Sequence, residues 1–437
     1  MAEKCRYFTR KNLDRLAQVA ALPIRQQLAI KAVSAVLPFR VNRYVVDELI
    51  DWDNVDTDPM FRQAFPQEGM LSQKDFGRML DLVRRDATTE QVSTAAREIQ
   101  LRLNPHPAGQ LELNVPTLAG KTVPGIQHKY RETVLFFPSQ GQTCHAYCTY
   151  CFRWAQFVGI DELKFASNDA ENLAGYLADH SEVNSVLFTG GDPMTMKARA
   201  LEQYIEPLLQ PGFEHIDSIR IGSKSLAYWP QRFVSDEDAD DTLRLFERVV
   251  AAGKHLAFMA HFSHPRELST PVVQKAIRRI QSTGAVVRSQ APLLRHINDS
   301  SDVWRDMWKT QVTLGIVPYY MFIARDTGPK EYFKVPIAHA LELFNHAYSR
   351  ISGLGRTVRG PSMSTTSGKV LVDGKMTVGG KRMLVLKMLQ CRNPDWVGRT
   401  FLAEYDETAA WIDDLTPAFG HDAFFFDGES SPSLRVV

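Results

Sequence analysis

The sequence predicts an α/β protein: a parallel, open, partial (β/α)6 barrel with a helical N-terminal region and a small C-terminal segment that contains β-strands. From residue 130 onward, short apolar runs alternate with segments of helical periodicity. Successive units of this kind favour parallel strands joined by right-handed crossovers. The six units are fewer than a closed barrel contains, so we expect an open barrel with its site at the C-terminal strand ends.

The composition is that of an ordinary globular protein. Of the 437 residues, 44% are hydrophobic and 23% are charged, and the net charge is +1. The balanced charge does not indicate a nucleic-acid-binding surface. No apolar signal segment or run of transmembrane length occurs, so we expect no membrane association. Five cysteines, three of them clustered, do not resemble a disulfide framework and fit a reducing, cytoplasmic compartment.

Three regions are expected along the chain, over residues 1–120, 121–350 and 351–437. The first 110 residues are predicted to be all-helical. Within them, residues 70–103 should form two helices, because Ala95, Ala96 and Ile99 recur at helical spacing. In the third region, the run Phe424–Phe426 is expected to pack on a core or on a neighbouring subunit.

The barrel strands are predicted from six apolar runs, at residues 134–137, 185–189, 218–222, 255–260, 286–290 and 317–322. Between them, one helix is predicted to start at Thr270-Pro271, a cap followed by proline at the first helical position, and to stop at Gly284. Another helix is predicted over residues 301–314.

The most distinctive motif is a cysteine loop after the first predicted strand. Cys144, Cys148 and Cys151 have the spacing C-x3-C-x2-C. Thiolates at such short spacing suit an iron–sulfur cluster, and three of them leave one iron of a [4Fe–4S] cluster open to a chelating ligand. A partial zinc site and buried structural thiols are the alternatives, although no second Cys or His pair at zinc-site spacing lies nearby. Cys5 and Cys391 are interpreted as ordinary thiols.

Polar residues also follow the other predicted strands. The second strand ends at Gly190-Gly191-Asp192, which is either a common turn or a place where a ligand approaches bare backbone. The fourth ends at His261 and His264, which are either ligands or hydrogen-bonded structural groups. The fifth ends at Gln290, and the sixth runs into Arg325-Asp326. These residues are expected to share one rim of the sheet.

The cysteine loop after strand one and Gly-Gly-Asp after strand two resemble the radical S-adenosylmethionine superfamily. The resemblance extends, in order and with similar gaps over residues 35–410, to the lysine 2,3-aminomutase family. The segments that carry it are Leu37–Val41, Ile50–Trp52, Gly125–Tyr130, Cys151–Arg153, Thr189–Asp192, Ile219–Ser223, Ala260–Pro265, Ser289–Asp299, Pro318–Tyr320 and Phe333–Pro336.

This resemblance implies three cofactors. A [4Fe–4S] cluster on the three cysteines would cleave S-adenosylmethionine to a 5′-deoxyadenosyl radical, and pyridoxal 5′-phosphate would be held as a lysine Schiff base. The implied reaction moves an amino group from the α- to the β-carbon of an amino acid. The resemblance places at S-adenosylmethionine the residues Gly190, Gly191, Asp192, His261 and Gln290. It places Arg153 at the substrate carboxylate, which a guanidinium fork suits, whereas a solvated or phosphate-facing arginine is the alternative.

The lysine that would carry pyridoxal phosphate is assigned by its distance from the apolar run at residues 384–388. That distance favours Lys369. Lys381, which follows Gly379-Gly380, is the rival, and a solvated lysine in a hairpin that binds no cofactor is the third alternative. Asp373-Gly374 is typical of a hairpin turn.

One departure from the family pattern bears on the substrate. Where lysine enzymes hold the distal ammonium with an aspartate, this chain has Arg325, with Asp326 beside it. An arginine would repel an ammonium in a partly desolvated pocket. If Arg325 faces the pocket, the substrate ends in a carboxylate or a neutral polar group. If Asp326 rotates in instead, lysine remains a substrate.

Three functions are consistent with these features. The first is a radical aminomutase that uses both cofactors. The second is a radical S-adenosylmethionine enzyme of another outcome, such as an epimerase, dehydratase or oxidase of an amine, without pyridoxal phosphate. The third is a non-catalytic cluster protein or electron carrier. For an enzyme, the expected partners are an amino acid substrate, an electron donor such as flavodoxin or ferredoxin, and a second copy in a homo-oligomer.

Overall fold

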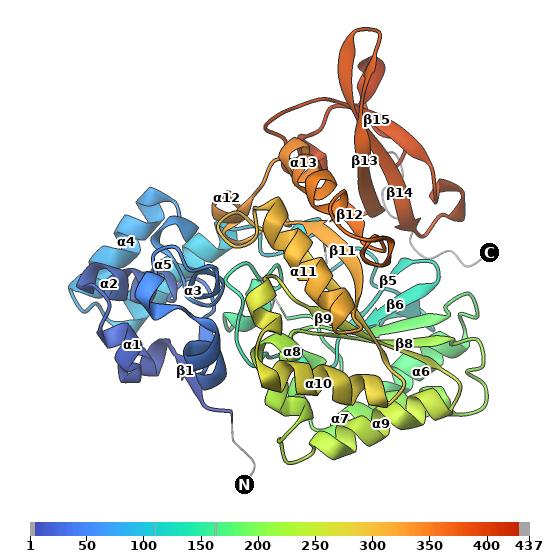
Figure 1. Cartoon of the computed structure of the whole chain (residues 1–437), viewed down its shortest axis with the longest axis horizontal. Helices are drawn as coiled ribbons and strands as arrows, with labels where there is room; N and C mark the ends of the chain where they lie inside the picture. The colour runs from blue at the N-terminus through green and yellow to red at the C-terminus, as the bar shows by residue number, and fades with distance from the viewer. Residues whose placement is uncertain (1–4, 110, 161, 163, 428–437) are drawn as a thin grey trace.

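A single curved sheet organises the molecule (Figure 1). The computed structural model describes residues 5–109, 111–160, 162 and 164–427. Within these residues, eleven strands follow one another in the order β15-β14-β13-β12-β11-β10-β9-β8-β7-β6-β5. Their bounds are β5 (Ile126–Tyr130), β6 (Thr133–Phe136), β7 (Ser185–Phe188), β8 (Ser218–Ser223), β9 (His255–His261), β10 (Val286–Leu293), β11 (Val317–Ile323), β12 (Arg359–Ser364), β13 (Gly368–Val378), β14 (Lys381–Cys391) and β15 (Thr400–Glu404).

The centre of the sheet is parallel and confirms the predicted fold class. The six predicted strands are β6 to β11, and each pairs in parallel with the next. A further parallel strand, β12, follows β11. It was not predicted, because its sequence, Arg-Gly-Pro-Ser-Met-Ser, is no apolar run. Antiparallel strands flank this core, with β5 at one edge and β13–β15 at the other.

The sheet curls far enough for its edge strand β5 to reach β14, the strand next to the opposite edge. The backbone N–H of Arg131, just after β5, donates to the carbonyl of Cys391 in β14 at 3.3 Å. The Arg392 side chain also donates to the carbonyl of His128 in β5. The result is a partial barrel. Its interior, the lumen, is bordered by strands that include β5, β8 and β13.

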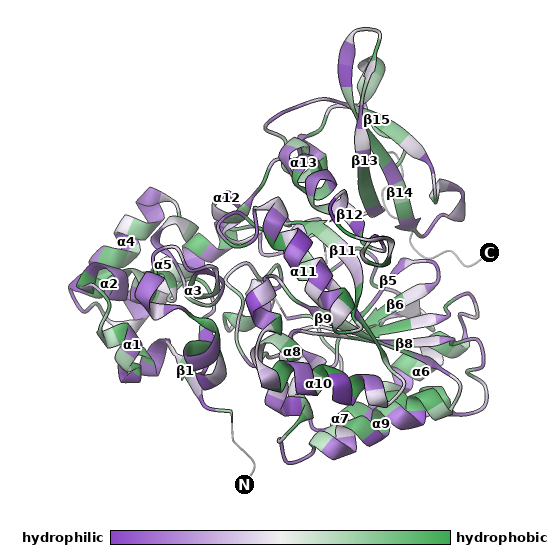
Figure 2. Ribbon diagram, in the orientation of Figure 1, coloured by the Kyte–Doolittle hydropathy of each residue, from purple (hydrophilic) through white to green (hydrophobic). Residues whose placement is uncertain are grey.

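Helices cover the outer face of the sheet. They are α6 (Ala170–Ala178), α7 (Ala198–Ile205), α8 (Ser225–Tyr228), α9 (Ala239–Ala251), α10 (Pro271–Ser282), α11 (Ser301–Thr313) and α13 (Ile337–Tyr348). The short α12 (Lys330–Phe333) packs against residues 68–70 of the N-terminal region instead. Polar and apolar residues alternate along α9 and α10 (Figure 2). The predicted cap is confirmed, since Thr270 accepts a hydrogen bond from the backbone N–H of Val273. In β8, Ile219 and Ile221 are fully buried toward the helices, whereas Arg220 between them is half-buried and faces the lumen.

The N-terminal region contains α1 (Ala17–Ala20), α2 (Ile24–Val33), α3 (Pro59–Ala64), α4 (Gln73–Arg84) and α5 (Thr89–Arg102), to the left of the barrel in Figure 1. The two helices predicted over residues 70–103 are α4 and α5. The all-helical expectation was wrong, because β1 (Tyr7–Thr9) pairs with β2 (Arg40–Asn42). Tertiary contacts explain β2: Asn42 is fully buried and its amide donates to the carbonyls of His145 and Tyr228. A small hairpin, β3 (Thr117–Leu118) and β4 (Lys121–Thr122), precedes β5.

The C-terminal hairpin turns at a different place from the one predicted. Asp373-Gly374 lies inside β13, where the pairing with β14 shifts at a bulge. The turn between β13 and β14 is Gly379-Gly380, whose φ values of +57° and +79° suit a tight two-residue hairpin turn. The Phe424–Phe426 run packs within its own chain, against Phe401 of β15. Among the described residues, no helix is long and apolar enough to cross a membrane.

Candidate functional site

The cysteine loop follows β6 and is held from the N-terminal region. The N–H of Tyr147 donates to the carbonyl of Arg40 at 2.8 Å, and the N–H of Thr149 donates to that of Gln63 at 2.9 Å. Buried backbone groups of the loop therefore find partners in α3 and β2 rather than in the barrel itself. The N-terminal region thus positions the loop over the end of the sheet.

The three thiols of this loop lie together in a poorly hydrated place. Burial raises the pKa of Cys144 well above its usual range, with smaller contributions from Asp192 and the other two thiols. Burial also raises the pKa of Cys151 to about 12, and Cys148 adds to the shift. A thiolate is costly here unless a bound metal centre offsets its charge. The donor set therefore fits a metal cluster.

The geometry does not favour a single metal ion. In the part of the chain that the structure describes, no three His, Cys, Asp or Glu side chains are placed to hold one ion. The thiolates of a cubane cluster each bind a different iron, so they need not converge on one point. A [4Fe–4S] cluster on this loop stays a prediction.

The Gly190-Gly191 segment packs directly on the approach to the cysteines. A side chain at Gly191 would meet the backbone N of Thr143 at 2.4 Å and the carbonyl of Gly141 at 2.7 Å. Gly190 has a φ of +136°, which disfavours other residues. The two glycines therefore let the β7 loop approach the cysteine loop.

Asp192 anchors this loop instead of presenting a free carboxylate. It is buried and accepts hydrogen bonds from the hydroxyls of Ser223 and Ser225, both at 3.0 Å, and from the backbone N–H of Met194 and Lys224, both at 2.9 Å. A carboxylate with so many donors is already satisfied. Contact between Asp192 and S-adenosylmethionine stays a prediction, and the structure shows instead that Asp192 joins β7 to β8.

His261 and Gln290 lie side by side at the ends of β9 and β10. They are partners in the parallel register of these strands. The Nε2 atom of His261 is buried and has no hydrogen-bond partner among the described residues. Burial lowers the pKa of His261 well below its usual range, and the Lys224 ammonium adds to this. A neutral imidazole whose ring nitrogen has no protein partner can form a hydrogen bond with a polar group of a ligand.

Arg153 is buried just beyond the cysteines. It is 3% exposed, and its guanidinium lies 4.2 Å from the ring centre of Phe137. It donates to the carbonyl of Phe165 at 3.3 Å, while its Nε has no partner among the described residues. Burial lowers the pKa of Arg153 to about 10. Such a cation is positioned to receive an anion, and the solvated alternative does not apply.

The two rival lysines have opposite surroundings. Lys369 in β13 is 7% exposed, its Nζ lies 4.0 Å from the ring centre of Tyr320, and it donates to Oε1 of Gln390 at 3.3 Å. Burial, followed by three nearby arginines, lowers its pKa well below the usual range. A neutral buried amine is a competent nucleophile toward an aldehyde. Lys381 is exposed at the start of β14, beside the hairpin turn.

The environment of Lys369 fits pyridoxal phosphate. The hydroxyls of Tyr320 and Ser362 are buried and have no hydrogen-bond partner among the described residues. Arg220 and Arg359 are two of the arginines near Lys369, and Arg359 also lies 4.6 Å from the Tyr320 ring centre. An aromatic ring, unused hydroxyls and guanidinium groups match a phosphorylated pyridine ring. Arg131, just after β5, pairs with Glu132 and is exposed.

Arg325 and Asp326 point in different directions. Burial lowers the pKa of Arg325, and its guanidinium lies 4.6 Å from the ring centre of Phe152, next to Cys151. The Asp326 carboxylate pairs with Lys330, and its backbone carbonyl accepts from the Asn104 amide. The structure therefore brings Arg325 into the site with Arg153 and Lys369 and leaves Asp326 at the rim.

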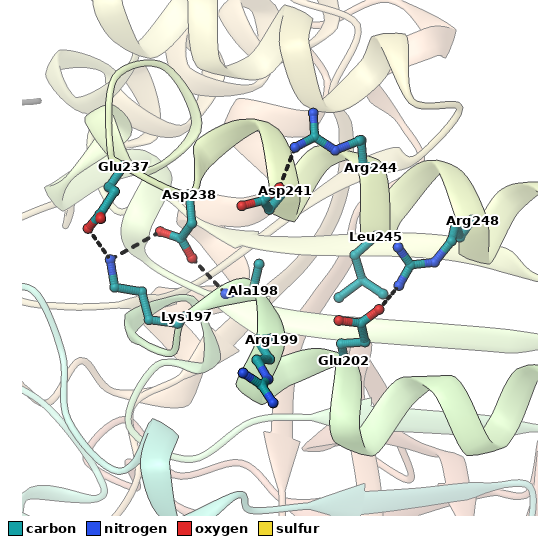
Figure 3. A pocket seen from close by; sticks show the side chains of 10 residues that line it. All are labelled: Lys197, Ala198, Arg199, Glu202, Glu237, Asp238, Asp241, Arg244, Leu245 and Arg248. Atoms are coloured by element: carbon teal, nitrogen blue, oxygen red, sulfur yellow. Dashed lines mark hydrogen bonds and ion pairs between the residues drawn. The ribbon is translucent and has the colours of Figure 1, made fainter.

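Sequence reasoning missed three basic residues of the lumen: Lys129, Arg220 and Arg359. Each is half-buried within a strand. A basic residue at a lumen-facing position of a strand is the signal that would have found Arg220, which stands between two apolar residues. A cavity of about 460 Å³ lies elsewhere, between α7 and α9, and three of its four basic lining residues, Lys197, Arg244 and Arg248, pair with acids beside them (Figure 3).

Comparisons with known proteins indicate the family of this chain. The chain is 30% identical over 399 residues to "Putative L-lysine 2,3-aminomutase" of Aquifex aeolicus, which covers 91% of this chain and 93% of that protein. It is 26% identical over 274 residues to L-lysine 2,3-aminomutase of Clostridium subterminale, covering 63% of this chain and 62% of that enzyme. It is 27% identical over 211 residues to glutamate 2,3-aminomutase of Clostridioides difficile, covering 48% of this chain and 47% of that enzyme.

The remaining comparisons do not by themselves assign a family. No protein-family model matches the chain. A radical SAM methyltransferase from Sphaerobacter thermophilus is similar in structure with a TM-score of 0.36 and 12% identity, over 55% of this chain and 68% of that one. The extent and identity of the match to the Aquifex protein decide the family. The chain belongs to the lysine 2,3-aminomutase family of the radical S-adenosylmethionine superfamily.

Proposed function

We propose that the protein is a radical S-adenosylmethionine aminomutase that moves an amino group from the α- to the β-carbon of an amino acid. One observation carries the proposal. The Lys369 amine lies 5.5 Å from the ring centre of Phe322 in β11, and Arg325, three residues later in the chain, lies 4.6 Å from the ring centre of Phe152 in the cysteine loop. In the proposal, the cysteine loop, Arg153 and Lys369 therefore act in one lumen, as an aminomutase requires.

In this proposal the chain's own residues hold three cofactors. Cys144, Cys148 and Cys151 would hold a [4Fe–4S] cluster, and the rim formed by His261 and Gln290 would contact S-adenosylmethionine. When bound, the cluster and S-adenosylmethionine supply a radical that abstracts hydrogen, and pyridoxal phosphate supplies a carrier for the migrating amine. An external donor such as flavodoxin or ferredoxin would supply the electron.

The remaining residues bind and orient. Lys369 would carry pyridoxal phosphate, because its amine is buried and the basic groups around it favour the neutral form. Arg220 and Arg359 are placed for the phosphate, and the Tyr320 ring, 4.0 Å from the Lys369 amine, would fix the plane of the pyridine. Arg153 would hold the α-carboxylate, which leaves the β-carbon directed toward the cysteine loop.

The test is anaerobic reconstitution with iron, sulfide, S-adenosylmethionine and pyridoxal phosphate, assayed on a panel of amino acids. We expect 5′-deoxyadenosine and a β-amino product from at least one of them. Lys369→Ala should abolish both the product and the visible absorption of bound pyridoxal phosphate. Lys381→Ala is the matched control and should retain both.

Two results would overturn the proposal. Formation of 5′-deoxyadenosine without any β-amino product, together with no dependence on Lys369, would indicate a radical enzyme of another outcome that works without pyridoxal phosphate. No 5′-deoxyadenosine from the reduced, reconstituted protein would exclude radical chemistry altogether.

A further inference from the structure

The lumen collects an unusual set of unpaired basic groups. Its basic side chains come from four strands, one strand end and the cysteine loop: Lys129, Arg153, Arg220, Arg325, Arg359 and Lys369. Across residues 5–109, 111–160, 162 and 164–427, none of these side chains forms an ion pair with an acidic residue. A cation is seldom fully buried without a counter-charge, and Arg153 is only 3% exposed.

Other buried cations of this chain do have acidic partners. Lys224 pairs with Glu267 at 2.7 Å, and Arg232 pairs with Asp238 at 3.2 Å. Among these described residues, it is therefore the basic side chains of the lumen that have no acidic partner. Cation–π contacts hold the lumen cations instead: Arg153 lies over Phe137, and Arg325 lies over Phe152 at 4.6 Å.

Resting on the proposed aminomutase function, we propose that the substrate is an amino acid whose side chain ends in a carboxylate, and that Arg325 and Lys129 receive this distal carboxylate. The other basic side chains of the lumen already have a use in that function. Lys369 would carry pyridoxal phosphate, Arg220 and Arg359 flank its position, and Arg153 is placed for the α-carboxylate.

Arg325 has the central position that a distal subsite needs. Its guanidinium lies 4.6 Å from the ring centre of Phe152, the neighbour of Arg153, and it follows β11, whose Phe322 ring centre lies 5.5 Å from the Lys369 amine. Lys129 and Lys369 both lie near the Tyr130 ring, at 5.7 and 5.4 Å, and the Tyr130 hydroxyl shares a hydrogen bond with Ser364 at 3.1 Å. In the proposal, a substrate held by Arg153 beside Lys369 directs its distal end toward Arg325.

The acids at the rim do not create a subsite for an ammonium. A small cavity of about 60 Å³ is bordered by Arg325 together with Asp326 and Asp413. The Asp326 carboxylate is paired with Lys330, and Asp413 is exposed. A distal ammonium at either acid would share this small cavity with the Arg325 guanidinium, at a Coulombic cost.

The test measures binding and turnover separately in the reconstituted holoenzyme. Calorimetric titration with glutamate, 2-aminoadipate, glutamine and lysine gives affinities that do not depend on catalysis. We expect glutamate or 2-aminoadipate to bind about ten- to a hundredfold more tightly than glutamine and lysine, because one charge-assisted contact differs. Arg325→Gln should remove this preference, whereas Arg325→Lys, which keeps the charge, should retain part of it.

Different results would overturn the distal carboxylate subsite and the aminomutase function. Equal or tighter binding of lysine or glutamine by the wild type, or a preference that persists in Arg325→Gln, would overturn the distal carboxylate. Turnover of lysine to a β-amino product with no turnover of dicarboxylic amino acids would overturn it too, while leaving the aminomutase intact. A carboxylate preference in binding without a β-amino product from any amino acid would support the subsite and reject the proposed reaction.

Discussion

The buried pair between Lys224 and Glu267 offers the sharpest stability test of this structure. The two groups lie 2.7 Å apart, the Glu267 side chain is 0% exposed, and that of Lys224 is 10% exposed. Glu267 also accepts hydrogen bonds from the Gln63 amide at 2.6 Å and from the backbone N–H of His264 at 3.2 Å. Because Gln63 belongs to α3, this carboxylate connects the N-terminal region to the barrel.

Replacing Glu267 by Gln keeps the shape and removes the charge. Lys224 then becomes a buried cation without an acidic partner and keeps only its long hydrogen bonds to the His261 carbonyl and the Ser263 hydroxyl, at 3.3 and 3.4 Å. One carboxylate oxygen that accepted hydrogen bonds also becomes an amide nitrogen that cannot accept them. Removing one member of a buried ion pair costs about 3–5 kcal/mol. That is a large share of a total stability of about 5–15 kcal/mol. We therefore expect Glu267→Gln to lower the free energy of unfolding by about 3–5 kcal/mol.

The measurement is urea unfolding followed by tryptophan fluorescence and by circular dichroism. A matched control is Glu237→Gln, which breaks the ion pair with Lys197 at 3.2 Å, where the two side chains are 83% and 65% exposed. That exposed pair should show no measurable loss, because water already solvates both charges. The double variant Lys224→Met with Glu267→Gln should be more stable than Glu267→Gln alone, since it leaves no unpaired cation.

The reasoning would be refuted by a loss below about 1 kcal/mol for Glu267→Gln, since that is the range of exposed pairs. Equal losses in Glu267→Gln and Glu237→Gln would refute it as well. Either result would mean that Lys224 finds water or another acceptor when Glu267 is neutral.

Further predictions concern the cluster and the cofactor lysine. Cys148→Ala should lose the iron and the broad visible absorption of the reconstituted protein. Cys391→Ala should keep both, because the Cys391 thiol lies outside the cysteine loop and donates to the Asn393 carbonyl at 2.9 Å. Equal iron content in the two variants would contradict the assignment of the cluster to the cysteine loop. Burial and neighbouring arginines lower the pKa of Lys369, so Arg359→Gln, which removes one of these cations, should raise that pKa. The pH at which pyridoxal phosphate incorporation reaches half its maximal rate should then move upward, and an unchanged or lower midpoint would contradict the placement of Arg359.

Much of the barrel could be predicted because its signals are local. Apolar runs marked β6 to β11, and the Thr270-Pro271 cap marked the start of α10. β12 could not be predicted in this way, because Gly360-Pro361 interrupts it and pairing with β11 makes it a strand. The hairpin turn was misplaced because Asp373-Gly374 and Gly379-Gly380 are both good turn sequences. The register between β13 and β14 decides between them.

The site residues also fall into two groups: those that a local motif predicted and those that only the fold revealed. The cysteine spacing pointed to a cluster because all three ligands belong to one loop. Lys369 and Lys381 differ little in their local sequence, and only the fold buries the first and exposes the second. Lys129, Arg220 and Arg359 gave no motif, because each stands alone in its own strand.

The sequence by itself determined the family, the parallel strands and the cysteine loop, because these depend on periodicity and on residues close together in the chain. Only the tertiary structure decided how charge is distributed over the lumen. Arg325 and Asp326 are neighbours in sequence, yet the fold places Arg325 among the lumen cations and pairs Asp326 with Lys330 at the rim. The net charge of the lumen is a sum over strands that are far apart in the chain, so it exists only once the sheet has curled and brought them together.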